Sequence, residues 1–125
     1  VQNTLDDVMF ASNKITEFCK ENNLGAKKTM QVSLALEEML TVIITYCMDP
    51  KKKQFIDIRI LCLEEDVLLR IRNTGRIFDP VRYYEENKDN EDMAESVLGI
   101  KMIAGSAKEI TFHETFGTNN LLIRF

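Results

Sequence analysis

The chain has 125 residues, a formal net charge of -4, 45% hydrophobic residues and 29% charged residues. This composition is normal for one folded domain and excludes a disordered chain. The 16 basic residues are scattered, and the one basic cluster, Lys51–Lys53, indicates a solvated loop rather than a nucleic-acid surface. We therefore expect one domain over residues 1–125 with no nucleic-acid partner. Because the chain lacks an initiating Met, we expect that it was trimmed or excised from a longer protein.

The apolar residues and the cysteines bear on location and metal chemistry. The best candidate for a membrane span, Met39–Met48, is about half as long as a membrane helix must be, which argues against membrane contact. The three cysteines are widely spaced, and His113 is the only histidine, so neither a metal site nor a disulfide framework is expected. The sequence instead predicts reduced, mostly buried thiols in a cytoplasmic domain.

Two helices are predicted at the start of the chain. Apolar residues at helical spacing within Leu5–Glu21 indicate an amphipathic helix. Thr4, with Asp7 three positions later, resembles a capping box at its start, and Gly25 is a candidate C-cap at its end. The second helix is predicted over Thr29–Met48, and its apolar second half is expected to be buried.

Strands and a long irregular segment follow. Two strands, Phe55–Leu63 and Val67–Asn73, are joined by a tight polar turn. Thr74–Val97 has little periodicity, so we expect a functional lid or a disordered loop, with Arg76–Val97 as the most mobile segment. The remaining predicted elements are a short helix over Leu98–Ala104 and strands over Glu109–Thr115 and Asn120–Phe125.

The order of these elements predicts the fold class. Two helices, two strands, a long loop, a helix and two strands succeed one another. This order is typical of an α+β fold, here a two-layer sandwich with helices on one face of a mainly antiparallel mixed sheet.

The second helix carries two candidate charged residues. Glu37 and Glu38 are the only charged residues within Thr29–Met48. Adjacent helical residues point about 100° apart, so one carboxylate can face water while the other faces a cleft. The alternative, that both are solvated, stays open because charged side chains are rarely buried without a partner.

Asn73 is a candidate ligand-binding group at the end of a strand. Strand side chains alternate, so Asn73 continues the core-facing row of Val67, Leu69 and Ile71. It precedes Gly75, where the backbone can come close to a ligand. The alternative is that Asn73 starts a turn, as Asn often does.

Two glycines and the histidine are weaker candidates. Gly99 is predicted to open a short helix, whose free N–H groups can bind phosphate, although a glycine also permits close packing. Gly117 and Thr118 lie in a predicted hairpin turn, which favours glycine for backbone reasons alone. His113 is expected on a solvated strand face, and no catalytic triad can be derived from the spacing.

Four segments, in this order, resemble motifs of the GHKL family, and specifically its branch of anti-sigma-factor serine kinases. Leu34–Cys47 resembles the N-box helix, and Asn73–Pro80 resembles the adenine-site motif, in which Asp-x-Gly is followed by Phe-Asp-Pro. Leu98–Ile103 resembles the glycine motif after the ATP lid, and Gly117–Thr118 resembles the Gly-Thr before the last strand. The resemblance covers nearly the whole chain and implies the histidine-kinase-like ATPase fold.

The resemblance implies a role for each matched residue and ATP or ADP as the ligand. Glu38 matches the N-box Glu, the catalytic residue that assists attack on the terminal phosphate. Asn73 matches the Asp that accepts a hydrogen bond from the adenine amino group, and Gly75 matches the glycine that lets the base approach. Gly99 matches a lid glycine beside the phosphates, and Thr118 resembles a threonine near the adenine.

The sequence departs from the family pattern where magnesium and phosphate bind. The family's magnesium-binding Asn falls on Val42, a common basic residue falls on Thr45, and the first glycine of Gly-x-Gly falls on Val97. Magnesium demands oxygen ligands in near-octahedral geometry, so no metal ligand is assigned and catalysis is expected to be weak or lost. At Asn73, an amide can still accept from the adenine amino group.

These observations leave three hypotheses. The chain is an ATP-binding regulator with serine kinase activity toward a partner, such as a sigma factor or an anti-anti-sigma-like protein, with a homodimer among the allowed assemblies. Alternatively, it is a non-catalytic relative that regulates through protein–protein contacts and binds nucleotide weakly or not at all. The third hypothesis is an unrelated α+β ligand-binding module. Val42 and Val97 favour the second hypothesis over the first, and the four ordered motifs count against the third.

Overall fold

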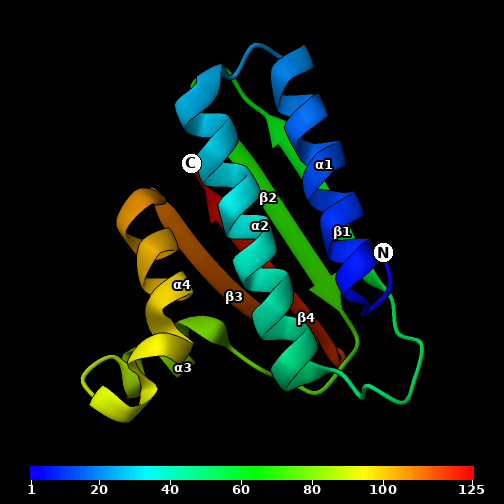
Figure 1. The fold of residues 1–125 in the computed structure, drawn as a ribbon, viewed down its shortest axis with the longest axis vertical. Coiled ribbons are helices and arrows are strands. Elements are labelled where there is room, and N and C mark those ends of the chain that lie inside the picture. Colours follow the sequence, from blue (N-terminus) through cyan, green and yellow to red (C-terminus); the bar gives the residue numbers. More distant parts are fainter.

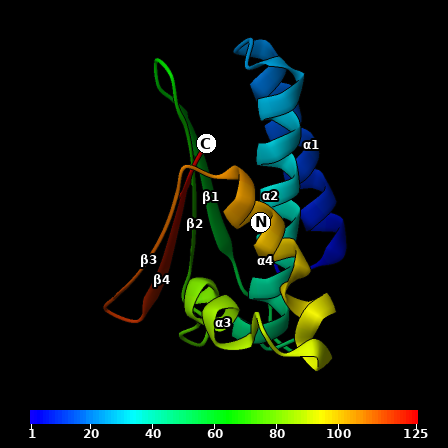
Figure 2. The same cartoon turned by 90° about the vertical axis from the view of Figure 1, so that its left-hand side faces the viewer.

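The computed structural model describes all residues, Val1–Phe125, and shows helices α1, α2 and α4 on one face of a four-stranded sheet (Figures 1 and 2). This two-layer arrangement confirms the α+β fold class. The elements in chain order are α1 (Leu5–Glu21), α2 (Gly25–Cys47), β1 (Ile56–Cys62), β2 (Val67–Asn73), α3 (Pro80–Asn87), a 3-10 turn (Glu91–Met93), α4 (Ala94–Ser106), β3 (Glu109–Thr115) and β4 (Thr118–Arg124).

The sheet has the strand order β1-β2-β4-β3, and each neighbouring pair is antiparallel. No parallel pair occurs, although the sequence allowed a mixed sheet. The reason is that β4 reverses from β3 through a tight turn and pairs with β2 along its other edge. The turn residues Phe116 and Gly117 have φ angles of 50° and 76°, so the reversal is shorter than the four-residue turn expected and β4 begins at Thr118.

The first two helices differ from their predicted form at their starts. Thr4 caps α1 as expected, because its Oγ1 accepts from Asp7 N at 3.2 Å. The capping box is not closed, since the Asp7 carboxylate accepts from Gln2 N at 2.6 Å instead. α2 begins at Gly25, one turn before the predicted start. Asn23 and Gly25 have positive φ, so the chain turns within three residues and helix can resume at once.

The core lies between α1, α2 and α4 and the helix-facing side of the sheet. α2 runs through its centre, and its Val32, Ala35, Leu36, Met39 and Leu40 are completely buried. At 23 residues, α2 is longer than predicted. Its length and composition alone would allow it to cross a membrane. Its burial against α1, α4 and the sheet explains its apolar character as that of a core helix.

The segment predicted as a long loop is mostly helical, which corrects the expectation for Thr74–Val97. Asp79 caps α3, because its Oδ1 accepts from the backbone N–H groups of Val81 (2.9 Å) and Arg82 (3.2 Å). Pro80 occupies the first turn, where its missing N–H costs nothing. The periodicity was too short to reveal an eight-residue helix, although Asp79-Pro80 is a start signal. The mobility of this segment stays a prediction.

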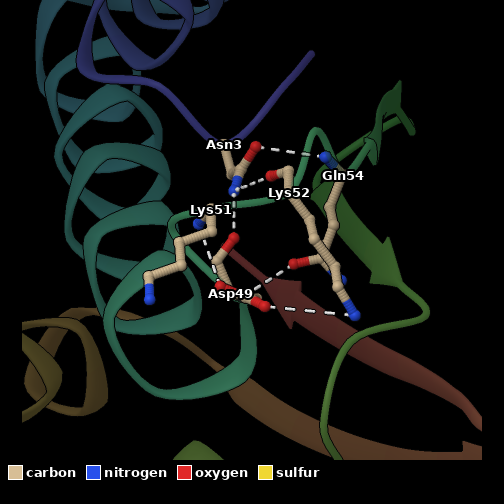
Figure 3. Close-up of polar contacts among 5 residues, drawn as sticks. All are labelled: Asn3, Asp49, Lys51, Lys52 and Gln54. Atoms are coloured by element: carbon tan, nitrogen blue, oxygen red, sulfur yellow. Dashed lines mark hydrogen bonds and ion pairs between the residues drawn. The ribbon is translucent and has the colours of Figure 1, made fainter.

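The loop between α2 and β1 is tied to the N-terminal segment (Figure 3). Asn3 Nδ2 donates to the carbonyl oxygens of Asp49 (3.3 Å) and Lys52 (3.0 Å). Asn3 Oδ1 accepts from Gln54 N at 3.1 Å, and Gln54 Oε1 accepts from Asp49 N at 2.7 Å. These bonds fix the exit from α2, while the three lysine side chains of the loop remain exposed, as expected.

Candidate functional site

The two adjacent carboxylates of α2 point toward different helices. Glu37 Oε1 accepts from Ser12 Oγ of α1 at 2.5 Å. Glu38 instead packs against α4, with its carboxylate beside Gly99. The predicted divergence of the two side chains is therefore correct. Both are half-buried, so the alternative that both are simply solvated is wrong.

Gly99 lies inside α4 and does not open it, which corrects the prediction. The helix begins at Ala94, so the Gly99 N–H lies beyond the first turn, whose N–H groups are free for a ligand. A Cβ at Gly99 would lie 2.0 Å from Glu38 Oε2 and 2.7 Å from its Cδ. The glycine therefore serves the close approach of α4 to Glu38, the packing alternative that the sequence left open.

The side chains near Glu38 on α2 are either apolar or already paired within the protein. Val42, one turn beyond Glu38, is 7% exposed and belongs to the core. Thr41 Oγ1 donates to the Glu37 carbonyl at 2.8 Å, and Thr45 Oγ1 donates to the Thr41 carbonyl at 2.7 Å. These hydroxyls are bonded back to their own helix, and the Glu37 carboxylate is held by α1.

Asn73 ends β2 on the helix-facing side of the sheet, as strand alternation predicted, and is 4% exposed. Its Oδ1 accepts from Gly75 N at 3.0 Å and from Asn119 Nδ2 at 3.0 Å. An amide oxygen has two lone pairs, so both are used within the chain. The bond to Gly75, two residues on, is the turn-forming role that the sequence left as an alternative.

Asn119 is the residue that the sequence analysis missed. It lies opposite Asn73 in the β2–β4 register and is 3% exposed. Its Nδ2 also donates to the Arg76 carbonyl at 3.0 Å, and its Oδ1 accepts from Phe78 N at 3.1 Å. The signal was the alternation of β4, in which Asn119 shares a face with two buried apolar residues. The same alternation places Thr118 on the opposite face, away from Asn73.

Gly75 allows the close backbone approach that was predicted, but the approach is to α2. A Cβ at Gly75 would lie 2.4 Å from the Cys47 carbonyl oxygen. The next residue, Arg76, donates its backbone N–H to that oxygen at 2.7 Å. The loop after β2 therefore caps the last turn of α2. Burial also raises the pKa of the Cys47 thiol to about 11, against the opposing charge of Arg76.

The space beside Asn73 is filled by the chain itself. The cavity that Asn73 lines together with Asn119, Phe78 and Pro80 has a volume of about 10 Å³, barely enough for one water molecule. Tyr46 of α2 stacks on Phe78, with ring centroids 5.1 Å apart and planes inclined by 13°. Neither Glu38 nor Gly99 lines this cavity, so the single cleft expected for Asn73, Glu38 and Gly99 is not formed here.

A third aromatic residue holds α3 against the end of α2. The Tyr83 and Tyr46 hydroxyls lie 3.0 Å apart and share a hydrogen bond. Burial, and secondly this hydrogen bond, raise the pKa of Tyr83. The region of Glu38 and Gly99 is distant from the region of Asn73 and Gly75, which contacts Cys47. Glu38 lies nine residues before Cys47, which is roughly 13 Å along α2.

A comparison with known families decides the assignment. The family model described as the histidine kinase-like ATPase domain matches residues 1–125. The chain belongs to the histidine kinase-like ATPase domain family. This membership excludes the third hypothesis, an unrelated ligand-binding module, and indicates a regulatory ATP-binding domain at a general level. No curated protein matches the chain.

The residues of this ATPase-family domain can be tested against the groups that such a domain implies. The position that the resemblance assigns to the magnesium ligand does not fit the ion, because Val42 is apolar and buried and magnesium requires oxygen ligands. An adenine ring does not fit beside Asn73 in this conformation, because the cavity is too small and the amide oxygen is saturated. The cavity beside Asn73, at the C-terminal end of α2, is therefore closed.

Proposed function

We propose that this domain is a regulatory member of its family that resembles anti-sigma-factor serine kinases and has absent or very weak phosphoryl transfer. ATP or ADP binds, with little dependence on magnesium, when the loop after β2 moves away from Asn73. The observation that carries this proposal is the buried Val42, one helical turn beyond Glu38. The closed Asn73 side supports the need for movement.

The chemistry of phosphoryl transfer explains why Val42 matters. Transfer depends on positioning and on neutralising phosphate charge, and a metal ion supplies much of both. Without a cation, the Glu38 carboxylate would face the phosphates directly, and like charges in a partly dry cleft repel. Lys101, on α4 near Gly99, is exposed and compensates at most in part.

The test restores the missing oxygen with Val42→Asn, and Val42→Ala is the matched control that removes the same packing without adding a ligand. ATP affinity is measured by calorimetry with magnesium and with a chelator, and phosphorylation of a cognate partner is assayed in parallel. We expect the wild type and Val42→Ala to respond little to magnesium, and Val42→Asn to gain magnesium-dependent affinity. Strong magnesium-dependent binding and turnover by the wild type would overturn the proposal.

The second candidate function is a non-catalytic protein–protein regulator that binds no nucleotide. The saturated oxygen of Asn73 favours it, because a second residue, Asn119, already takes the acceptor that adenine would use. Thermal-shift measurements with ATP and ADP, each with and without magnesium, separate the two candidates. A shift with either nucleotide supports the first, and no shift at saturating concentrations supports the second.

For either function we propose a cytoplasmic regulatory protein partner, such as a sigma factor or an anti-anti-sigma-like protein, and a homodimer as the candidate assembly. The family resemblance of the N-box helix and the adenine-site motif supports these proposals. Sedimentation velocity over a range of concentrations tests the dimer. A sedimentation coefficient that stays at the monomer value throughout would contradict it.

A further inference from the structure

The face of the sheet turned away from the helices carries a basic groove. Figure 2 shows this face uncovered, with the β3–β4 hairpin projecting away from the helices. A hollow of about 590 Å³ lies on it, and the residues that matter for its chemistry are Arg70, Arg72, His113, Phe116, Thr118 and Asn120. We call this set the outer groove. No carboxylate lines the hollow, although the whole chain has a net charge of -4.

The strand register aligns the polar groups of the outer groove in rows. Arg72 of β2 lies opposite Asn120 of β4, which lies opposite His113 of β3. Two residues before Arg72 on β2, Arg70 shares its face because strand side chains alternate. Two such residues on one strand are about 6.8 Å apart, so their guanidinium groups present two positive charges at the spacing of alternate side chains on an extended peptide.

The guanidinium groups have donors that the chain does not use. Arg70 Nη2 lies 3.6 Å from Asp57 Oδ2, an ion pair between partly exposed side chains. Arg72 forms no ion pair and no side-chain hydrogen bond within the protein. Arg70 Nε and Arg72 Nε are buried donors without a protein acceptor, and Arg70 Nη2 has only the ion pair with Asp57. Buried donors normally have a hydrogen-bond acceptor. Carboxylates suit these donors, because the planar fork of Arg binds them in bidentate fashion.

Phe116, at the tip of the β3–β4 hairpin, is a second and independent sign of a binding surface. Its side chain lines the outer groove and is fully exposed. Its backbone has φ of 50°, a conformation that a bulky residue adopts at a cost and that Gly or Asn would occupy more readily. A strained, exposed aromatic residue is not explained by the folding of the hairpin, whereas contact with an apolar side chain of a partner would account for it.

We propose that the outer groove binds an extended acidic segment of a protein partner. Two carboxylates two residues apart on the segment pair with Arg70 and Arg72, and an apolar side chain packs on Phe116. The opposite sign of the groove and the carboxylates provides the complementarity. The site lies on the other face of the sheet from Asn73 and does not depend on the proposed nucleotide function.

Fluorescence anisotropy with a labelled peptide that contains Phe-Ser-Glu-Thr-Glu tests the proposal on the wild-type chain. We expect saturable binding that weakens with added salt and falls by about tenfold in Arg72→Ala, which loses a charge-assisted bidentate contact. Arg59→Ala is the matched control, because Arg59 is an exposed cation on the outer face of β1, opposite Arg70, that does not line the hollow. Its affinity is expected to stay within about twofold of the wild type.

Phe116→Gly separates binding from folding. Glycine takes positive φ freely, so this variant is expected to have an unchanged or higher melting temperature and severalfold weaker peptide binding. Three results would overturn the proposal: no binding by the wild type, equal losses in Arg59→Ala and Arg72→Ala, or equal binding of a peptide with both Glu replaced by Gln. Displacement of the peptide by inorganic phosphate at the same concentration would identify a general anion site and would also overturn it.

Discussion

The two faces of strands β2 and β4 use their polar side chains in opposite ways. On the helix-facing side, Asn73 and Asn119 are buried and bonded to each other and to the loop that follows β2. On the outer side, Arg70 and Arg72 retain buried N–H groups without an acceptor in the chain. The comparison shows that the polar groups on the helix-facing side are paired within the chain, whereas the outer face keeps donors that the chain does not pair.

The largest effect is expected from Gly75→Ala on the inner side. The new methyl group would lie 2.4 Å from the backbone oxygen of Cys47 and 3.1 Å from Asn73 Oδ1. A backbone atom cannot turn aside, so the loop must move, at a cost of about 2–4 kcal/mol in the free energy of unfolding. Urea denaturation measures this. A loss of less than about 1 kcal/mol would mean that the loop after β2 is not held against α2.

The next effect compares neighbouring asparagines on opposite faces. Asn119→Ala removes the partner of Asn73 and of the Phe78 N–H, and it should cost about 1–3 kcal/mol because buried groups lose their hydrogen bonds. Asn120→Ala removes only a contact with the Thr118 carbonyl and should cost less than about 1 kcal/mol. Equal destabilisation in urea denaturation would contradict the contrast between the faces.

The sequence predicted most of the fold because the relevant patterns are long. Helical spacing identified α1, and strand alternation placed Asn73 on the buried face. The same alternation could have revealed Asn119. The turn was predicted to include Thr118 and Asn119, however, whereas both belong to β4. α3 was missed because eight residues carry little periodicity.

The candidate site could be predicted only in part, because it depends on contacts between distant elements. The sequence indicated that Glu37 and Glu38 diverge, but not that α4 lies against Glu38. Whether Gly99 serves a ligand or close packing depends on the position of α4, which no local pattern specifies. The saturation of Asn73 likewise requires β4 to be placed beside β2.

A smaller effect tests whether Gly99 serves packing alone. In Gly99→Ala, the methyl group meets the carboxylate end of Glu38, which can rotate away, so a cost of about 1 kcal/mol is expected. In a Glu38→Ala background, the same change should stabilise α4 by about 0.5–1 kcal/mol, the helix preference of Ala over Gly. Gly105→Ala is the control, since no atom lies within 4 Å of its added methyl group. A double-mutant cycle with no coupling between Glu38 and Gly99 would refute this contact.

The smallest effect concerns alkaline pH at the inner side. The pKa of Cys47 is raised from 9.0 to about 11 in the folded chain, so the folded state favours the neutral thiol. Its contribution to stability is complete below pH 9.0 and is lost as the pH rises toward 11. Unfolding curves should therefore show a steeper alkaline loss for the wild type than for Cys47→Ala. Parallel pH profiles for the two proteins would exclude a thiol buried in this way.

The central claim is that the cavity beside Asn73 is closed and that Val42 takes the place of a magnesium ligand. Nuclear magnetic resonance titration with ATP tests this claim most directly. Backbone and side-chain amide signals are followed with magnesium and with a chelator. The account predicts that any shifts begin at Asn73 and Asn119, require high ATP concentrations and are nearly the same in both conditions. Large shifts around Glu38, Val42 and Gly99 that occur only with magnesium would contradict it.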